Sequence, residues 1–197
     1  MPVGKQYVAA RHFAWAIPLA PACVVVHELG HLLAGRAFGY PTRLHASSVS
    51  GGPSLETSEP LVAGLAAASG PLASTLLTAI ACLLIVRRGP HPALVVLALF
   101  DMLRIALTTL GLGWRMLITW QGAEVGPLDS DEYDALRAFG TAFILVMIAI
   151  NLLLIGIWTW TIRHIRSSRP RVLAGVVAGS AVGLVLWFNL VGPALLG

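Results

Sequence analysis

A long apolar segment, residues 13–38, carries a small group of ionisable side chains. Its charged or imidazole residues are His27, Glu28, His31 and Arg36. A carboxylate between two imidazoles is costly at membrane depth, and a bound metal ion is one partner that would stabilise it. His27, Glu28 and His31 form the pattern H-E-x-x-H. On a helix the two histidines lie one turn apart on the same face, so both rings can reach one Zn²⁺.

The same pattern predicts different roles for its members. Glu28 is rotated around the helix from the two histidines, which suits a group that accepts a proton from a zinc-bound water rather than a ligand. A catalytic zinc usually has three protein ligands and keeps one position open for water. We therefore predict His27 and His31 as ligands, Glu28 as the catalytic base, and a third ligand elsewhere in the chain.

The third ligand has more than one candidate. Asp101 is the first choice, because it is a lone carboxylate in an apolar segment that runs towards the same face as the first. The alternative for Asp101 is an ion pair with Arg104, three residues later, with no role at a metal. Asp129 and Asp131, in the acidic loop at residues 124–134, are the reserve candidates.

Two further side chains have the right chemistry but a weaker case. Cys23 precedes His27 by one helical turn on the same face, although cysteine is also an ordinary buried residue. His45 could approach the site from the loop after the first apolar segment. We expect neither to be a ligand.

Composition sets the class of protein. Hydrophobic residues make up 57% of the 197 residues and charged residues 11%, whereas soluble domains carry about a quarter charged residues. Five segments are long enough to span about 30 Å of hydrocarbon. We place them at residues 13–36, 61–86, 93–113, 138–162 and 172–195. The sequence therefore predicts an all-α polytopic membrane protein with about five transmembrane helices.

The segments between these predicted helices differ in character. Residues 39–60 combine an extended pattern with Gly and Pro, which predicts a short surface hairpin or extended segment. Residues 114–136 hold most of the acidic side chains. We predict one membrane domain, with a core at 1–115 and the acidic loop plus two further helices at 116–197. In the last helix, Gly175, Gly179 and Gly183 form a packing stripe, either within the chain or between chains.

Basic residues cluster at the ends of the predicted spans. With five spans, the face that holds the N-terminus has eight of them and the opposite face four. This asymmetry predicts a multi-pass protein of the cell membrane with its N-terminus in the cytoplasm. The same clustering indicates contacts with the lipid bilayer rather than with nucleic acid.

Four motifs, in chain order, resemble those of the site-2 protease family of intramembrane zinc metalloproteases. They are residues 27–31 (HELGH), 38–40 with 51–53 (FGY and GGP), 68–74 (ASGPLAS) and 100–104 (FDMLR). The likeness covers about the first 115 residues and implies a three-helix metalloprotease core. It also implies Asp101 as the third zinc ligand.

The chain departs from the family pattern at two positions. Ser74 stands where the family usually has asparagine, a residue thought to help hold the substrate or the oxyanion. Serine still donates a hydrogen bond, so the resemblance implies a substrate-binding role for Ser74. Met102 stands where glycine usually follows the aspartate, and the proline-rich lead-in is missing. The departure at Met102 and the missing lead-in concern the assignment of Asp101 and do not affect the two histidines.

The resemblance implies hydrolysis of peptide bonds within or beside the membrane, with single-span membrane proteins as the candidate substrates. The extended pattern of the segment around Arg43–Ser50 suggests that it pairs with the unwound substrate by strand addition, with Arg43 and Val49 as substrate-binding residues. One alternative is a non-proteolytic metal-binding scaffold or regulator of the same fold. It is suggested by Ser74 and Met102, which replace the usual asparagine and glycine of the family. Another is a zinc hydrolase that acts on a non-peptide membrane substrate.

Overall fold

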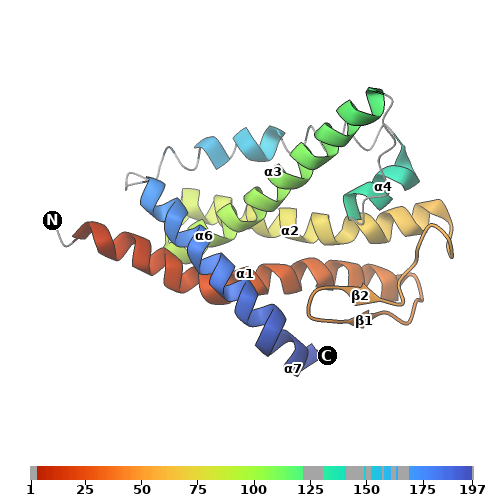
Figure 1. The fold of residues 1–197 in the computed structure, drawn as a ribbon, viewed down its shortest axis with the longest axis horizontal. Helices are drawn as coiled ribbons and strands as arrows, with labels where there is room; N and C mark the ends of the chain where they lie inside the picture. The colour runs from red at the N-terminus through yellow and green to blue at the C-terminus, as the bar shows by residue number, and fades with distance from the viewer. Residues whose placement is uncertain are drawn as a thin grey trace.

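The computed structural model describes residues 4–121, 131–140, 149, 152–156, 158–160, 163 and 169–196. Most of this part of the chain is helical (Figure 1). The long helices are α1 (Gly4–Ala37), α2 (Pro60–Arg88), α3 (Pro92–Trp120) and α6 (Arg169–Leu186). The shorter elements are α4 (Asp131–Phe139), the π-helical turn η1 (Trp187–Val191) and α7 (Gly192–Leu196).

Three stretches of the described chain are long and apolar enough to cross a membrane. They are Val8–Ala37, Pro60–Arg88 and Pro170–Leu196. They coincide with the first, second and fifth predicted spans, while the third predicted span falls within α3, which opens with the shorter apolar stretch Pro92–Asp101. About half of the predicted fourth span at 138–162, including most of residues 141–151, lies outside the described residues. The count of five spans and the side of the N-terminus therefore stay predictions.

Local sequence explains where α2 begins and ends. Pro60 opens the helix, where a missing N–H costs nothing because the first N–H groups of a helix have no partner within it. At the other end Gly89 has a φ of 90°, a conformation that favours glycine, and its N–H donates to the carbonyl of Ile85 at 2.9 Å. Because α2 begins at Pro60 and ends at Arg88, its residues 60–74 lie beside the H-E-x-x-H segment of α1.

The glycine stripe of α6 packs against α1 within the same chain. A methyl group on any of the three glycines would overlap a backbone carbonyl oxygen of α1. The pairs are Gly175 with Ala9, Gly179 with Phe13 and Gly183 with Ile17. Because small residues allow this close backbone approach, α1 and α6 share the most extensive helix contact in the described chain. The glycine stripe therefore forms a helix-packing contact within one chain.

The apolar core lies towards the N-terminal half of α1 and the C-terminal half of α2. Its most buried members come from α1, α2, α3 and α6, and include Ala16, Ala81, Val95, Val96 and Val176. This packing holds the four long helices together at one end of the molecule. The other end, where α1 finishes and α2 starts, is left for the polar groups.

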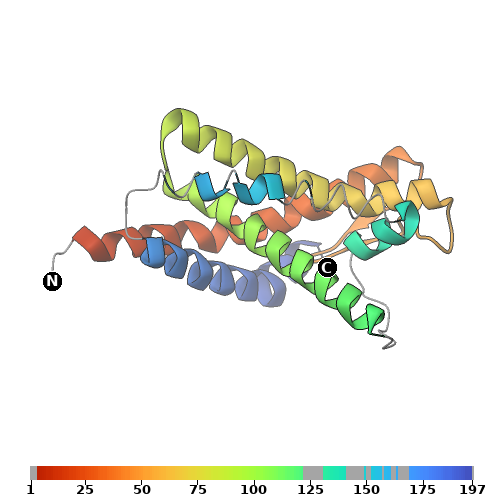
Figure 2. The same ribbon diagram turned by 90° about the horizontal axis from the view of Figure 1, so that it is seen from above.

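A two-stranded hairpin follows α1, as the extended pattern of residues 39–60 predicts. Strand β1 (Arg43–Leu44) pairs antiparallel with β2 (Val49–Ser50), with Arg43 opposite Ser50 and Leu44 opposite Val49. Figures 1 and 2 both show the hairpin, α4, the end of α1 and the start of α2 at the same end of the molecule. Segments far apart in the sequence therefore converge on the histidines of α1.

Candidate metal centre

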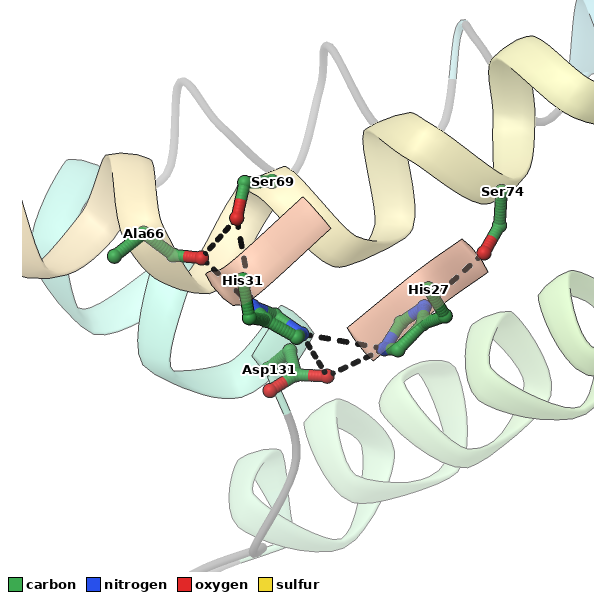
Figure 3. A network of polar contacts seen from close by, with 6 residues as sticks. All are labelled: His27, His31, Ala66, Ser69, Ser74 and Asp131. Atoms are coloured by element: carbon green, nitrogen blue, oxygen red, sulfur yellow. Dashed lines mark hydrogen bonds and ion pairs between the residues drawn. The ribbon is translucent and has the colours of Figure 1, made fainter. Parts of the chain in front are cut away.

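His27 and His31 of α1 meet Asp131 of α4 at one point (Figure 3). The Asp131 Oδ2 atom lies 3.0 Å from His27 Nε2 and 3.1 Å from His31 Nε2. The two Nε2 atoms are 3.3 Å apart. Two imidazole nitrogens and one carboxylate oxygen form a donor set that suits Zn²⁺ and leaves room for a fourth position. Among the described residues this is the group of side chains that could hold a metal ion.

Helix α2 orients both imidazoles through their other ring nitrogen. His31 Nδ1 donates to the carbonyl oxygen of Ala66 at 2.8 Å, and His27 Nδ1 lies 3.1 Å from the hydroxyl of Ser74. A hydrogen at Nδ1 leaves the lone pair of Nε2 free for a metal. Figure 3 shows both Nε2 atoms turned towards Asp131. The supports that metal-binding histidines require are therefore already present in the fold.

A close crossing of α1 and α2 makes these supports reachable. A methyl group on Gly30 would lie 2.5 Å from the carbonyl oxygen of Ser69, and one on Gly70 would overlap the ring of His31. Glycine at both positions thus lets the backbones approach and leaves space for the imidazole. This gives a physical reason for the glycine of the segment ASGPLAS.

Asp131 carries a negative charge in this arrangement. Burial alone would raise the pKa of its carboxyl, but the hydrogen bonds with His27 and His31 outweigh that effect and hold the pKa well below its usual range. The carboxylate is the form that binds a metal.

Helix α4 is seated on α2 close to the site. A methyl group on Gly64 would lie 2.6 Å from the Cβ of Ala138 and 2.7 Å from the ring of Phe139. The missing side chain at Gly64 thus lets the last turn of α4 rest on the first turns of α2. Seating its C-terminal end there fixes Asp131, at the other end, beside the histidines.

The structure does not bring the first-choice ligand, Asp101, into the group. Asp101 is buried, with 2% of its surface exposed, and accepts a hydrogen bond of 3.1 Å from the Thr78 hydroxyl. Thr78 lies one turn along α2 from Ser74, so Asp101 faces a level of the bundle about one turn away from His27. The reserve candidate Asp131 takes the place beside the histidines, because α4 folds back over the start of α2.

The remaining candidates fall outside the group or outside the described residues. Cys23 is buried and is not part of the group. His45 belongs to the hairpin, where its Nε2 lies 2.8 Å from the Ser50 hydroxyl. Asp129 and the side chain of Arg104 lie outside the part of the chain that is described.

A cavity of about 510 Å³ opens beside Glu28 and His31. Asp131 and Asp134 line it from α4, and Ala63, Ala66 and Ala67 line it from α2. Residues 47–49 and 51–55 line it from the hairpin and the loop after it. Glu28 is 9% exposed and its side chain lines this cavity. Of the two predicted substrate-binding residues of the hairpin, Val49 lines the cavity, whereas Arg43 is exposed on β1 and does not.

Two contacts of the site were beyond the sequence prediction. Ser74 was assigned to the substrate by the resemblance, and in the structure its hydroxyl contacts His27. The carbonyl of Ala66 leaves no trace in a residue pattern, because every residue carries one. Ala66 and Ser74 are about two turns apart on α2, whereas His27 and His31 are one turn apart on α1, so the residue spacing gave no signal for these two contacts.

Comparisons of the chain with protein-family models, with curated proteins and with solved structures gave no match.

The choice between the two carboxylates is testable by metal content. We expect Asp131→Asn to lower zinc affinity more than about 100-fold, because losing a ligand should exceed the 10- to 100-fold cost of losing a supporting residue. Asp101→Asn should keep stoichiometric zinc. Zinc bound to the purified membrane protein, measured by elemental analysis and chelator competition, distinguishes them. The reverse pattern would return the ligand role to Asp101.

Removal of the Ser74 hydroxyl should weaken the site without removing a ligand. We expect Ser74→Ala to lower zinc affinity about 10- to 100-fold, since the His27 ring loses the partner that orients it. Ser180→Ala is a matched control, because Ser180 is a buried serine of α6 whose hydroxyl has no hydrogen-bond partner among the described residues. Equal effects of the two variants on chelator competition would show that Ser74 does not act through His27.

Proposed function

We propose that the chain is an intramembrane zinc metalloendopeptidase that resembles the site-2 protease family. One observation carries the proposal: two imidazole nitrogens and a carboxylate oxygen converge beside the buried Glu28, at the edge of a cavity. Helix α1 carries the two histidines, and helix α2 carries the groups that orient their rings. Both helices are apolar and long enough to cross a membrane. Hydrolysis at membrane depth needs this combination of a water-activating site and a polar space for water.

The donor set fits zinc better than a hard cation. Zn²⁺ prefers imidazole nitrogen with few oxygens, whereas Mg²⁺ and Ca²⁺ prefer sites made mostly of oxygen. His27, His31 and Asp131 would hold the ion. When bound, zinc would lower the pKa of a water molecule and polarise the scissile carbonyl.

Glu28 is the group that would move the proton. It lies beside the ligands on α1 and faces the cavity, so its carboxylate can accept a proton from the attacking water and pass it to the leaving amine. His27 and His31 stay fixed by Ser74 and Ala66 during this exchange. The chain thus supplies a base that is separate from the ligands.

The edge of β2 that pairs with no other strand in the described part of the chain would hold the substrate backbone. The His45 N–H donates to the Ser48 carbonyl at 2.8 Å, so the alternation of an antiparallel pair makes Leu44 and Val49 the non-hydrogen-bonded pair. The N–H and carbonyl of Val49 then point away from β1. Because Val49 lines the cavity, an unwound segment of a membrane-embedded protein, such as a single-span substrate, could pair there by strand addition.

The base can be tested apart from the metal. We expect Glu28→Gln to lower cleavage of a single-span reporter in proteoliposomes by about 10²- to 10⁴-fold, because proton transfer is lost. Zinc content should not change. Glu56→Gln, at an exposed glutamate of the loop after the hairpin, should leave cleavage intact. A wild-type protein that binds zinc and cleaves no membrane protein would favour the metal-binding scaffold instead.

Strand addition can be tested with a matched pair of prolines. Val49→Pro removes an N–H from the edge that lines the cavity and spares the bonds between β1 and β2. We expect kcat/KM for the reporter to fall about tenfold, the effect of one lost hydrogen bond at the upper end of its usual strength. Leu44→Pro removes the equivalent N–H from the opposite edge and should have little effect. Equal losses in both variants would contradict pairing at β2.

A further inference from the structure

The tip of the hairpin is joined to the C-terminal end of the described chain. The indole N–H of Trp187, in η1, donates to the carbonyl oxygen of Ala46 at 2.7 Å. Ala46 lies in the turn between β1 and β2, and Trp187 follows directly after α6. This hydrogen bond can fix the hairpin turn against η1 only if the backbones of Ala46 and Trp187 are also held close together.

Gly192 brings the two backbones together. A methyl group at this position would lie 2.7 Å from the Cβ of Ala46 and 2.9 Å from the carbonyl oxygen of Trp187. The Gly192 N–H bonds that same Trp187 carbonyl across five residues, which is the π-helical pattern of this turn. Such turns are uncommon and often occur at functional sites. The glycine and the turn together set the indole on the hairpin tip.

The opposite end of the hairpin is held by α1. The Thr42 hydroxyl donates to the Leu32 carbonyl at 3.2 Å, and the Thr42 methyl group packs where Gly35 has no side chain. The base of the hairpin is therefore fixed to the helix that carries the histidines. With the base on α1 and the tip on η1, Val49 of β2 is held at the wall of the cavity.

We propose that Trp187 is a positioning residue for substrate binding: it clamps the hairpin tip and so holds the edge of β2 in place for the peptide. Helix α6 packs along α1 through its glycine stripe, so the clamp is anchored to the same helix as the metal ligands. The inference rests on the proposed peptidase function. It adds a role for the C-terminal helix, which lies outside the core predicted from the motifs.

The test combines hydrogen exchange with kinetics on the full-length protein in nanodiscs. Trp187→Phe keeps an aromatic ring and removes the N–H donor. We expect the amides of residues 43–50 to exchange about fivefold faster, the effect of one lost neutral hydrogen bond on a local opening. KM for the single-span reporter should rise by a similar factor with kcat unchanged, because the reacting groups are untouched. Zinc content should stay the same.

Gly192→Ala places a methyl group between Ala46 and Trp187 and so disturbs the same contact. It should reproduce both the faster exchange and the higher KM. The matched controls are Trp114→Phe, at an exposed tryptophan of α3, and Gly111→Ala, where an added methyl group meets nothing within 4 Å. Neither should change exchange of the hairpin.

Each outcome decides the proposal. Unchanged exchange in Trp187→Phe overturns the clamp, and faster exchange with an unchanged KM overturns its role in substrate binding. A fall in kcat or in zinc content would show that Trp187 acts on the metal centre instead. A wild-type protein that cleaves no reporter refutes the peptidase proposal and, with it, the role in substrate binding, while the exchange data still show whether the hairpin is clamped.

Discussion

The close crossing of α1 and α2 at Gly30 and Gly70 is the constraint on which the site depends. It brings the carbonyl of Ala66 and the hydroxyl of Ser74 within hydrogen-bonding distance of the two imidazoles. A ring that is fixed at Nδ1 presents Nε2 in a defined direction, and both Nε2 atoms then converge. Wider spacing of the helices would leave the rings free to rotate and the buried nitrogens without partners, which is costly in an apolar environment.

Charge explains why α4 lies where it does. Two imidazoles and Glu28 are polar groups in a bundle whose other members are mostly apolar, and each needs a partner. Asp131 supplies a carboxylate to both rings at once, with a pKa lowered by those contacts. The absence of a side chain at Gly64 allows α4 to lie low enough on α2 for that contact. Packing and electrostatics thus select the same position for the helix.

The hairpin depends on the helix bundle in the same way. Its strands are two residues each, too short to be stable alone. Thr42 ties its base to α1, and Trp187 ties its tip to the end of α6. The glycine stripe holds α6 along α1, so the packing of these two helices also fixes Trp187 against the tip of the hairpin.

By itself the sequence determined what depends on neighbours along the chain. The spacing of His27, Glu28 and His31 sets them on a helix by its period, and runs of apolar residues predicted the helices that the structure describes as α1, α2 and α6. Only the tertiary structure decided which carboxylate meets the histidines, that Ser74 contacts His27, and that Trp187 reaches Ala46. These contacts join residues from 47 to 141 positions apart, and they depend on how closely helices approach, which the pattern of a single segment does not encode.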